Sequence, residues 1–397
     1  MGIPLDGGNK EMKNDETDIL IVGGGPAGAT SALYLTELGL DITLVEKKKF
    51  PRETLCGEFL SKEVTVVLKE LDLFEEFISL KPNKLKSFKA ISKSGVELTS
   101  TLNFEAYGMK RSVFDEMLLD RVKRKNINVI QPGEVLGINK TNRGFFTEIL
   151  PAKGESYGIN SRYVIGAYGR QNKLDKRLGR NFIDKKSQLN GVKFHFPVNM
   201  LNEYCLDEIR IYFEEGFYCG INQVNEAEVT ICFLEYRNNS QLSPRDKLLE
   251  VIKSNPKFNQ LFRDDAIDFI KSINVYGTGN IFFGKRKLVE NGIIMIGDSA
   301  RVIAPLAGDG IGMAMESAKL LSSIMNANKT EDLDSDKVYD EYEKRFARLF
   351  NRRLRTAGYL QKIMLSKFFS KSALRIVSSL NIPVSSLIKN TRNREVL

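Results

Sequence analysis

The sequence contains no tryptophan and a single histidine, His195, and its four cysteines never form a Cys-x-x-Cys pair. Zinc and non-haem iron sites collect several histidine or cysteine ligands, so no metal site is expected, and Ser-His-Asp hydrolases are disfavoured. The chain also lacks any run of about 18 uncharged apolar residues, and its polar N-terminus has no apolar stretch typical of a secretory signal. These absences predict a cytoplasmic protein without a membrane-spanning helix.

The chain has 397 residues, of which 42% are hydrophobic and 27% charged. This composition is typical of folded proteins rather than disordered ones. Because a single hydrophobic core stops growing near roughly 250 to 300 residues, the length favours two closely joined domains.

Positive charge is concentrated at the C-terminal end. Residues 344–397 carry thirteen lysines and arginines and one acid, Glu395, whereas the whole chain has a net charge of +9. Apolar residues are interleaved with these charges up to Pro383, which predicts basic helices. Two interpretations stay open: the segment binds an anionic membrane surface at the inner face of the membrane, or it packs on the body of the protein. No nucleic-acid reader motif accompanies the charge, so nucleic acid is not an expected partner.

Hydrophobic patterns divide the chain into two interleaved domains. Apolar runs at 18–22 and 41–45 flank a helical pattern at 26–38, which predicts a β-α-β unit in a parallel sheet, and short alternating strands between 190 and 275 predict an antiparallel one. The predicted fold class is α/β, a Rossmann-like nucleotide-binding domain with an inserted antiparallel β-sheet substrate domain and a C-terminal helical tail. The expected segments are a flexible leader at 1–17, the nucleotide-binding domain at 18–80, 105–189 and 276–330, the substrate domain at 81–104 and 190–275, and basic C-terminal helices at 331–397.

A glycine motif marks the first turn of the predicted β-α-β unit. Gly23, Gly25 and Gly28 form Gly-x-Gly-x-x-Gly directly after the first strand, and Glu46 closes the second strand. Such glycines allow a tight turn and a close approach of a pyrophosphate, the helix N-terminus attracts that anion, and the acid accepts hydrogen bonds from a ribose. The sequence therefore predicts a dinucleotide here. The predicted contacts are Gly23, Gly25, Pro26, Ala27, Gly28, Glu46 and Lys47.

A second motif follows the apolar run 293–296: Gly297-Asp298, then Pro305, Gly308, Gly310, Ile311 and Gly312. It resembles the Gly-Asp motif of the FAD-dependent aromatic hydroxylase superfamily, the group A flavin monooxygenases, which includes geranylgeranyl reductase-like members. The resemblance extends in patches from 17 to about 325. It implies a GR2-type FAD-binding domain with non-covalent FAD, in which Asp298 binds the ribityl chain and residues 305–312 lead into a helix aimed at the flavin pyrimidine edge.

The same resemblance extends to three other places. The segment 50–59 resembles the Pro-x-x-x-x-Cys-Gly stretch of geranylgeranyl reductase-like members, which implies that Arg52, Cys56 and Gly57 lie along the flavin. Cys56 is the candidate catalytic residue, although a buried inert thiol is the commoner role of cysteine. Arg111 resembles the arginine that reaches the flavin linkage, and Val135 the residue whose backbone holds adenine.

The sequence departs from the family pattern in places that affect function. The family's Gly-Ala-Asp-Gly motif has Tyr168 in place of the acid, and no second Gly-x-Gly-x-x-Gly unit exists for a nicotinamide cofactor, so NADH or NADPH as electron donor stays open. The hairpin at 216–230 lacks the Trp and Pro of polyprenyl reductases, and a chain without tryptophan cannot carry the Trp-x-Trp-x-Ile-Pro signature of flavin halogenases. His195, on the strand face opposite Phe194 and Phe196, is interpreted as a satisfied or exposed strand residue rather than an active-site base.

These observations predict an FAD-dependent oxidoreductase that acts on a hydrophobic small molecule. Hydroxylation of an aromatic or lipid-like compound by a monooxygenase is the first hypothesis. Reduction of C=C bonds in an isoprenoid or polyketide by a geranylgeranyl reductase-like flavoprotein is the second. A flavin-binding, membrane-associated protein without turnover is the third.

Overall fold

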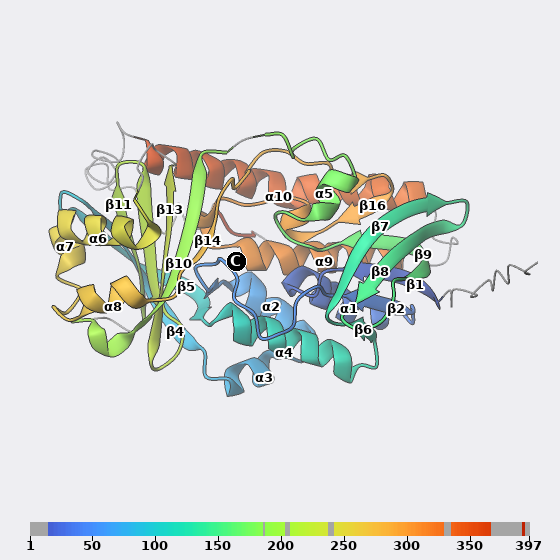
Figure 1. Cartoon of the computed structure of the whole chain (residues 1–397), viewed down its shortest axis with the longest axis horizontal. Coiled ribbons are helices and arrows are strands. Elements are labelled where there is room, and N and C mark those ends of the chain that lie inside the picture. Colours follow the sequence, from blue (N-terminus) through green and yellow to red (C-terminus); the bar gives the residue numbers. More distant parts are fainter. Residues whose placement is uncertain are drawn as a thin grey trace, which may run out of the picture.

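The computed structural model describes residues 15–185, 187–202, 207–236, 242–328, 335–366 and 391–393. Two β-sheets lie side by side along the long axis of the molecule, each with its own set of helices (Figure 1). The predicted α/β architecture, with a Rossmann-like half, a second sheet and a helical C-terminal region, is confirmed.

The first sheet has the strand order β15-β16-β9-β1-β2-β6, with the hairpin β7-β8 joined to it through β9. Strand β1 lies between β2 and β9 and is parallel to both, and its central residues are fully buried, as expected for an apolar strand in a covered parallel sheet. The strands are β1 (Asp15–Val22), β2 (Ile42–Val45), β6 (Asn128–Ile130), β7 (Gly133–Thr141), β8 (Gly144–Pro151), β9 (Tyr157–Gly166), β15 (Val289–Glu290) and β16 (Ile293–Met295). The first strand therefore begins at Asp15, inside the stretch 1–17 that the sequence assigned to a flexible leader.

The second sheet has the order β14-β10-β13-β12-β11-β4-β5-β3 and is antiparallel except where β11 runs parallel to β4. Its strands are β3 (Phe59–Leu60), β4 (Asn83–Ser92), β5 (Glu97–Gly108), β10 (Leu189–Pro197), β11 (Glu208–Glu214), β12 (Phe217–Gln223), β13 (Glu228–Tyr236) and β14 (Tyr276–Thr278). Four of these strands, β3, β14, the end of β5 and the first residue of β10, include residues that the sequence assigned to the nucleotide-binding domain. Strands β3 and β14 form the two edges of the sheet. The sequence did not predict them, because strands of two or three residues show little periodicity.

Alternation along β10 gives the two faces of this sheet different surroundings. Phe194 and Phe196 pack into a core with the helices on the outer side of the sheet, at the left of Figure 1. Those helices are α6 (Pro244–Ser254), α7 (Pro256–Asn259) and α8 (Ala266–Ser272). Lys193 and His195 point to the opposite face, toward the first half of the molecule, since successive side chains in a strand alternate.

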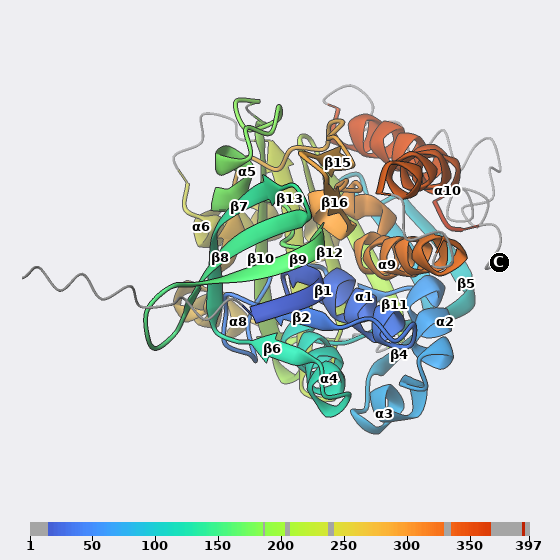
Figure 2. The same cartoon turned by 90° about the vertical axis from the view of Figure 1, so that its right-hand side faces the viewer.

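The remaining described helices lie with the first sheet, and α1 contacts both α4 and α9 (Figure 2). They are α1 (Pro26–Thr36), α2 (Lys62–Glu70), α3 (Phe74–Ser79), α4 (Arg111–Arg124), α5 (Lys173–Arg177) and α9 (Gly310–Ala327), with 3-10 turns η2 (Gly297–Ser299) and η3 (Pro305–Ala307). A further 3-10 turn, η1 (Val198–Met200), follows β10 and packs on the outer core of the second sheet. Helices α2 and α3 are separate, because Asp72 between them has a φ of 54°, outside the helical range.

Helix α10 (Ser335–Leu365) runs across the top of both halves in Figure 1. Its buried residues recur every three or four positions and form one stripe that faces the body of the protein. Tyr342 donates a hydrogen bond to the carbonyl of Met295 in the first half, and Leu365 packs against the second sheet. Over 344–366 the apolar stripe is thus occupied by the body, whereas 367–390 and 394–397 lie outside the described residues. No described helix is long and apolar enough to cross a membrane.

The centre of α10 carries a buried arginine. The guanidinium of Arg353 forms ion pairs with Asp309 and with Glu316, the latter at 2.6 Å, and lies 3.8 Å from Glu63. Arg392 adds a second positive charge 3.7 Å from the Asp309 carboxylate. Acids from α2 and from the start of α9 are therefore neutralised by the C-terminal part of the chain.

We expect Arg353→Met to lower the free energy of unfolding by about 3–5 kcal/mol, because it leaves buried carboxylates without their main counter-charge. Urea denaturation at neutral pH measures the change. Arg355→Met, on an exposed position of the same helix, is the matched control and should change stability little. Equal stability of the two variants would contradict this account of α10.

Candidate active site

A cavity of about 950 Å³ lies between the first sheet and the second. Most residues that the sequence predicted to bind the cofactor line it, although they come from widely separated parts of the chain. These are Gly23, Gly25, Pro26, Ala27, Glu46, Lys47, Arg52, Cys56, Gly57, Arg111, Val135, Asp298, Pro305, Gly308, Gly310 and Ile311. Gly28 and Gly312 do not line the cavity.

The two exceptions are packing positions. A Cβ at Gly28 would lie 1.8 Å from the carbonyl oxygen of Gly23, so only glycine lets α1 pack this closely on the turn. A Cβ at Gly312 would lie 2.5 Å from a carboxylate oxygen of Asp309. The cofactor contacts expected at Gly28 and Gly312 stay predictions, and the packing explains why both positions need glycine.

The loop between β1 and α1 leaves room for an anion. A Cβ at Gly25 would meet only the Arg52 guanidinium, at 3.3 Å, and helix α1 has no side-chain cap at its N-terminus. Its first backbone N–H groups are therefore open toward the cavity. Glu46 accepts hydrogen bonds from the backbone N–H groups of Gly24 and Lys48, each at 2.7 Å, which holds its carboxylate beside the loop. This arrangement fits the pyrophosphate and ribose of a dinucleotide.

The surroundings of Asp298 show whether the cavity also suits the ribityl chain of FAD. Burial raises the pKa of its carboxyl above the usual value, although the charges of Arg170, Arg286 and Arg111 oppose the shift. Within the described part of the chain no group donates a hydrogen bond to this carboxylate, which faces the cavity. A desolvated acceptor without a protein donor suits the hydroxyl groups of a ribityl chain. The nearby start of α9 also lacks a side-chain cap, so its amides are open to an electron-rich ring.

Arg111 and Arg52 flank one buried acid, Asp115. Arg111 donates to both carboxylate oxygens of Asp115, at 2.6 and 2.8 Å, and Arg52 lies 3.4 Å from it. Burial would lower the pKa of Arg111, but the charge of Asp115 and its hydrogen bonds outweigh this and raise the pKa. Arg111 therefore stays charged at the cavity wall. The Cys56 side chain is close enough to contribute to the same shift.

Tyr168 replaces an acid of the family motif, and Asp175 supplies a carboxylate nearby. The Tyr168 hydroxyl donates to Asp175 at 3.0 Å, and Arg180 donates to the same carboxylate at 3.1 Å. Arg180 also donates to the backbone carbonyl of Ser299, which ties this cluster to the Asp298 loop. A buried acid-arginine pair therefore lies beside Tyr168, with the acid contributed by α5.

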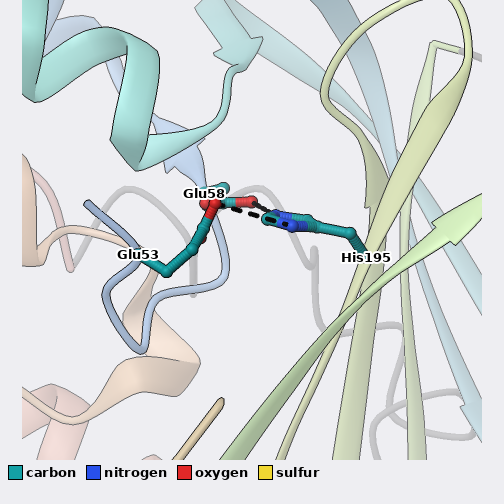
Figure 3. Close-up of side chains that lie close together, drawn as sticks. All are labelled: Glu53, Glu58 and His195. Carbon is teal, nitrogen blue, oxygen red and sulfur yellow. Dashed lines mark hydrogen bonds and ion pairs between the residues drawn. The ribbon is translucent and has the colours of Figure 1, made fainter. Parts of the chain in front are cut away.

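A cluster that the sequence did not predict lies where the main cavity borders the second sheet. Figure 3 shows three of its members, Glu53, Glu58 and His195. Glu58 is fully buried and accepts from Lys193 at 2.8 Å, from His195 at 2.7 Å, from the hydroxyl of Thr230, and from the backbone N–H of Arg111 at 2.9 Å. Burial would raise its pKa, but the hydrogen bond from His195 and the charge of Lys193 lower it to about 2. Glu58 is therefore ionised at neutral pH.

The signal that could have revealed this cluster is the pairing of Lys193 with His195 on one strand face. Two basic residues on the face opposite buried phenylalanines need a counter-charge if that face is covered. Sequence alone does not say that the face is covered, nor that Glu53 and Glu58 of a distant loop supply the charge.

Sequence comparison places this chain in a family of FAD-binding proteins. A sequence model of the family described as FAD binding domain matches residues 16–356. This chain belongs to that family. It is 26% identical over 372 residues to digeranylgeranylglycerophospholipid reductase 1 of Methanococcoides burtonii, covering 90% of this chain and 85% of that protein. It is 23% identical to the 1H-pyrrole-2-carbonyl-[peptidyl-carrier protein] chlorinase of Pseudomonas fluorescens, covering 84% and 80%.

The fold is shared with solved structures. A geranylgeranyl bacteriochlorophyll reductase-like protein from Thermoplasma acidophilum has a TM-score of 0.76 at 21% identity, with 95% of this chain and 96% of that chain covered. The predicted membership in the FAD-dependent hydroxylase and geranylgeranyl reductase-like superfamily is confirmed, and the protein is an FAD-dependent oxidoreductase.

The low pKa of Glu58 generates a stability prediction. A carboxyl with a folded-state pKa of about 2 against an ordinary 4.5 contributes stability that is complete above pH 4.5 and is lost as the pH falls toward 2. The contribution is on the order of 3 kcal/mol. We expect Glu58→Gln to be less stable than the wild type at pH 7, with the difference shrinking steadily from about pH 4.5 downward.

Urea denaturation of both proteins across this pH range measures the difference. Glu105→Gln, which removes an exposed carboxylate paired with Lys69, is the control and should give a small, flat difference. A Glu58→Gln difference that does not change with pH would show that this carboxylate is not held ionised by its partners.

Proposed function

We propose that this flavoprotein reduces C=C bonds of an isoprenoid-like or other hydrophobic chain, the second of the hypotheses drawn from the sequence. The observation that carries the proposal is a set of apolar side chains that line the main cavity and come from the Cys56 segment, the second sheet and the loops after β14 and β16. They include Leu55, Ile209, Ile211, Tyr218, Ile281, Val302 and Leu306. Such a lining suits a substrate that is itself largely hydrocarbon.

The similarity to proteins named as digeranylgeranylglycerophospholipid reductases supports the same choice, since they cover most of this chain. The chlorinase similarity supports halogenation less, because this sequence has no tryptophan and so lacks the halogenase signature. Hydroxylation stays the competing candidate, favoured by the breadth of the superfamily resemblance. In either case bound FAD supplies the two-electron redox chemistry.

The cofactor-binding roles expected from the sequence belong to this proposal. The amides at the start of α1 would hold the pyrophosphate, Glu46 a ribose and Asp298 the ribityl chain, with Val135 beside the adenine. The uncapped start of α9, at Gly310 and Ile311, would stabilise negative charge on the reduced ring. Cys56 would lie between this ring and the apolar lining, where a small polarisable side chain permits close approach of the substrate.

Product analysis tests the reaction. The purified yellow protein is reduced anaerobically with NADH, NADPH or dithionite, given a geranylgeranylated lipid, and the product is analysed by mass spectrometry. We expect each turnover to add two hydrogen atoms to the lipid in the absence of oxygen. NADH or NADPH is identified as a physiological donor if it reduces the flavin, seen as loss of its visible absorbance, at least as fast as turnover. A product that carries one added oxygen atom, formed only in air, would replace reduction by hydroxylation, and absence of flavin reduction by any donor would favour the hypothesis of no turnover.

The glycine loop gives a matched pair of variants. We expect Gly25→Ala to fold normally but to bind FAD at least about tenfold more weakly, a loss of roughly 1.4 kcal/mol, because the added methyl group points into the anion site. Gly28→Ala should instead destabilise the protein, since its methyl group would overlap the carbonyl of Gly23. Thermal denaturation without FAD and fluorescence titration with FAD separate the two effects. Unchanged FAD affinity in Gly25→Ala would argue against the proposed pyrophosphate site.

A further inference from the structure

A second, smaller cavity adjoins the main one at the Glu58 cluster. It has a volume of about 390 Å³ and shares Glu53 and Tyr276 with the main cavity. His195 lines only the second cavity, whereas Glu58 lines only the main one. The exposed residues Ser272 and Asn274 also line the second cavity, so it reaches the protein surface.

The cluster holds the His195 ring in one orientation. Its Nε2 is 2.7 Å from Glu58, which leaves Nδ1 on the side of Glu53, at 3.9 Å from the nearer carboxylate oxygen. Glu53 is also 2.7 Å from the ammonium group of Lys193 and has a side chain that is 21% exposed. A small rotation of the Glu53 side chain closes the gap to Nδ1, so the carboxyl can exchange a proton with the ring.

The charges around Glu53, Glu58 and His195 argue against a metal ion bound by these three residues. The donor atoms of Glu53, Glu58 and His195 lie close enough together to hold a cation. However, the ammonium group of Lys193 already lies between the two carboxylates, at 2.7 and 2.8 Å. A metal ion would have to displace or repel this buried charge.

We propose that Glu53 and His195 form a proton relay that connects the main cavity to solvent through the second cavity. Glu53 gives a proton to the substrate, takes one back from Nδ1 of the His195 imidazolium, and the imidazole regains a proton from water in the second cavity. One proton enters for each proton used, and no bond other than these changes. Glu58 and Lys193 are positioning residues, because they fix the ring and the carboxylate but are not on the path.

The relay supplies what a C=C reduction needs in addition to hydride, namely a proton on the second carbon. The relay rests on the proposed function in one respect: the reaction in the main cavity must consume a proton. The charged and titratable groups that face His195 are Glu58, Glu53, Lys193, Tyr276 and, across the second cavity, Lys110 and Glu228. Residues of strands and of loops around the imidazole ring are therefore charged or titratable. The dependence of kcat on pH will report the titration of all these groups together.

The first test is independent of turnover. Because His195 is the only histidine of the chain, diethyl pyrocarbonate treatment of the untagged, FAD-loaded protein reports one imidazole through its ultraviolet absorbance. We expect one carbethoxylated ring per chain and a reaction slowed several-fold in Ser272→Trp, which fills the mouth of the second cavity. Absence of modification, or the same rate in Ser272→Trp, would show that the second cavity gives no route to the ring.

The second test uses turnover of the holoenzyme with its reducible substrate. We expect His195→Gln and Glu53→Gln each to lower kcat by about 100-fold or more, the usual range for a lost proton donor, with KM and the FAD spectrum unchanged. Added imidazole should restore turnover in His195→Ala, and the solvent isotope effect should rise in His195→Gln. Glu105→Gln is the control and should leave kcat unchanged.

Three results would overturn the relay. They are an unchanged kcat in both Gln variants, a loss of kcat in His195→Ala that imidazole does not repair, and one tightly held metal ion per chain that is absent from His195→Ala. If the product analysis finds hydroxylation while imidazole still rescues His195→Ala, the proposed reaction fails and the relay stands. If reduction is found without these effects on kcat, the relay fails alone.

Discussion

The ionised carboxylate of Glu58 joins the two halves of this flavoprotein at the cavity. Its donors come from the start of α4 in the first half and from β10 and β13 in the second sheet. The backbone carbonyl of the same residue accepts from the amide of Met109 and from the side chain of Asn222. A single residue thus fixes the loop that carries Cys56 relative to both walls. Because the carboxylate is buried, it is stable there only while all these donors stay in place.

The backbone of Glu58 supports this interpretation. Its φ is 58°, in the left-handed region that residues other than glycine, asparagine and aspartate seldom adopt. Such a conformation costs on the order of 1 kcal/mol and persists where surrounding contacts over-determine it. The contacts of Glu58 do so, and they gather at the edge of the cavity where the chemistry is proposed. The left-handed turn aims the side chain at the second sheet while the loop continues along the cofactor half.

The part of the site that the sequence predicted is the part encoded locally. Gly23 and Gly25 precede a helix within one β-α-β unit, so their spacing identifies them. Asp298 follows the apolar run 293–296 and was identified through the Gly-Asp motif of the superfamily that the sequence resembles. The structure brings these segments to one cavity, as expected. The Glu58 cluster could not be predicted in this way, because its partners at 111, 193, 195 and 230 are separated by long stretches and share no spacing rule. Asp175 was missed for a similar reason, since its contact with Tyr168 is made by a residue of α5 that belongs to no motif.

The arrangement also explains how an apolar cavity can coexist with proton supply. In the proposed reaction, Leu55, Ile211 and Tyr218 would exclude water from the substrate, which suits hydride transfer to a hydrocarbon but removes the solvent that would protonate the product. A charged group could restore a proton source only where the protein balances its charge. Among the described residues, the charged residue that lines both cavities is Glu53, which is paired with the buried Lys193. The pairing lets a carboxylate lie at the border of a dry cavity without the full cost of desolvation. In the proposed reaction, the second sheet therefore has two roles: it contributes apolar residues to the substrate region, and its inner face carries the counter-charge of Lys193 that makes acid chemistry feasible there.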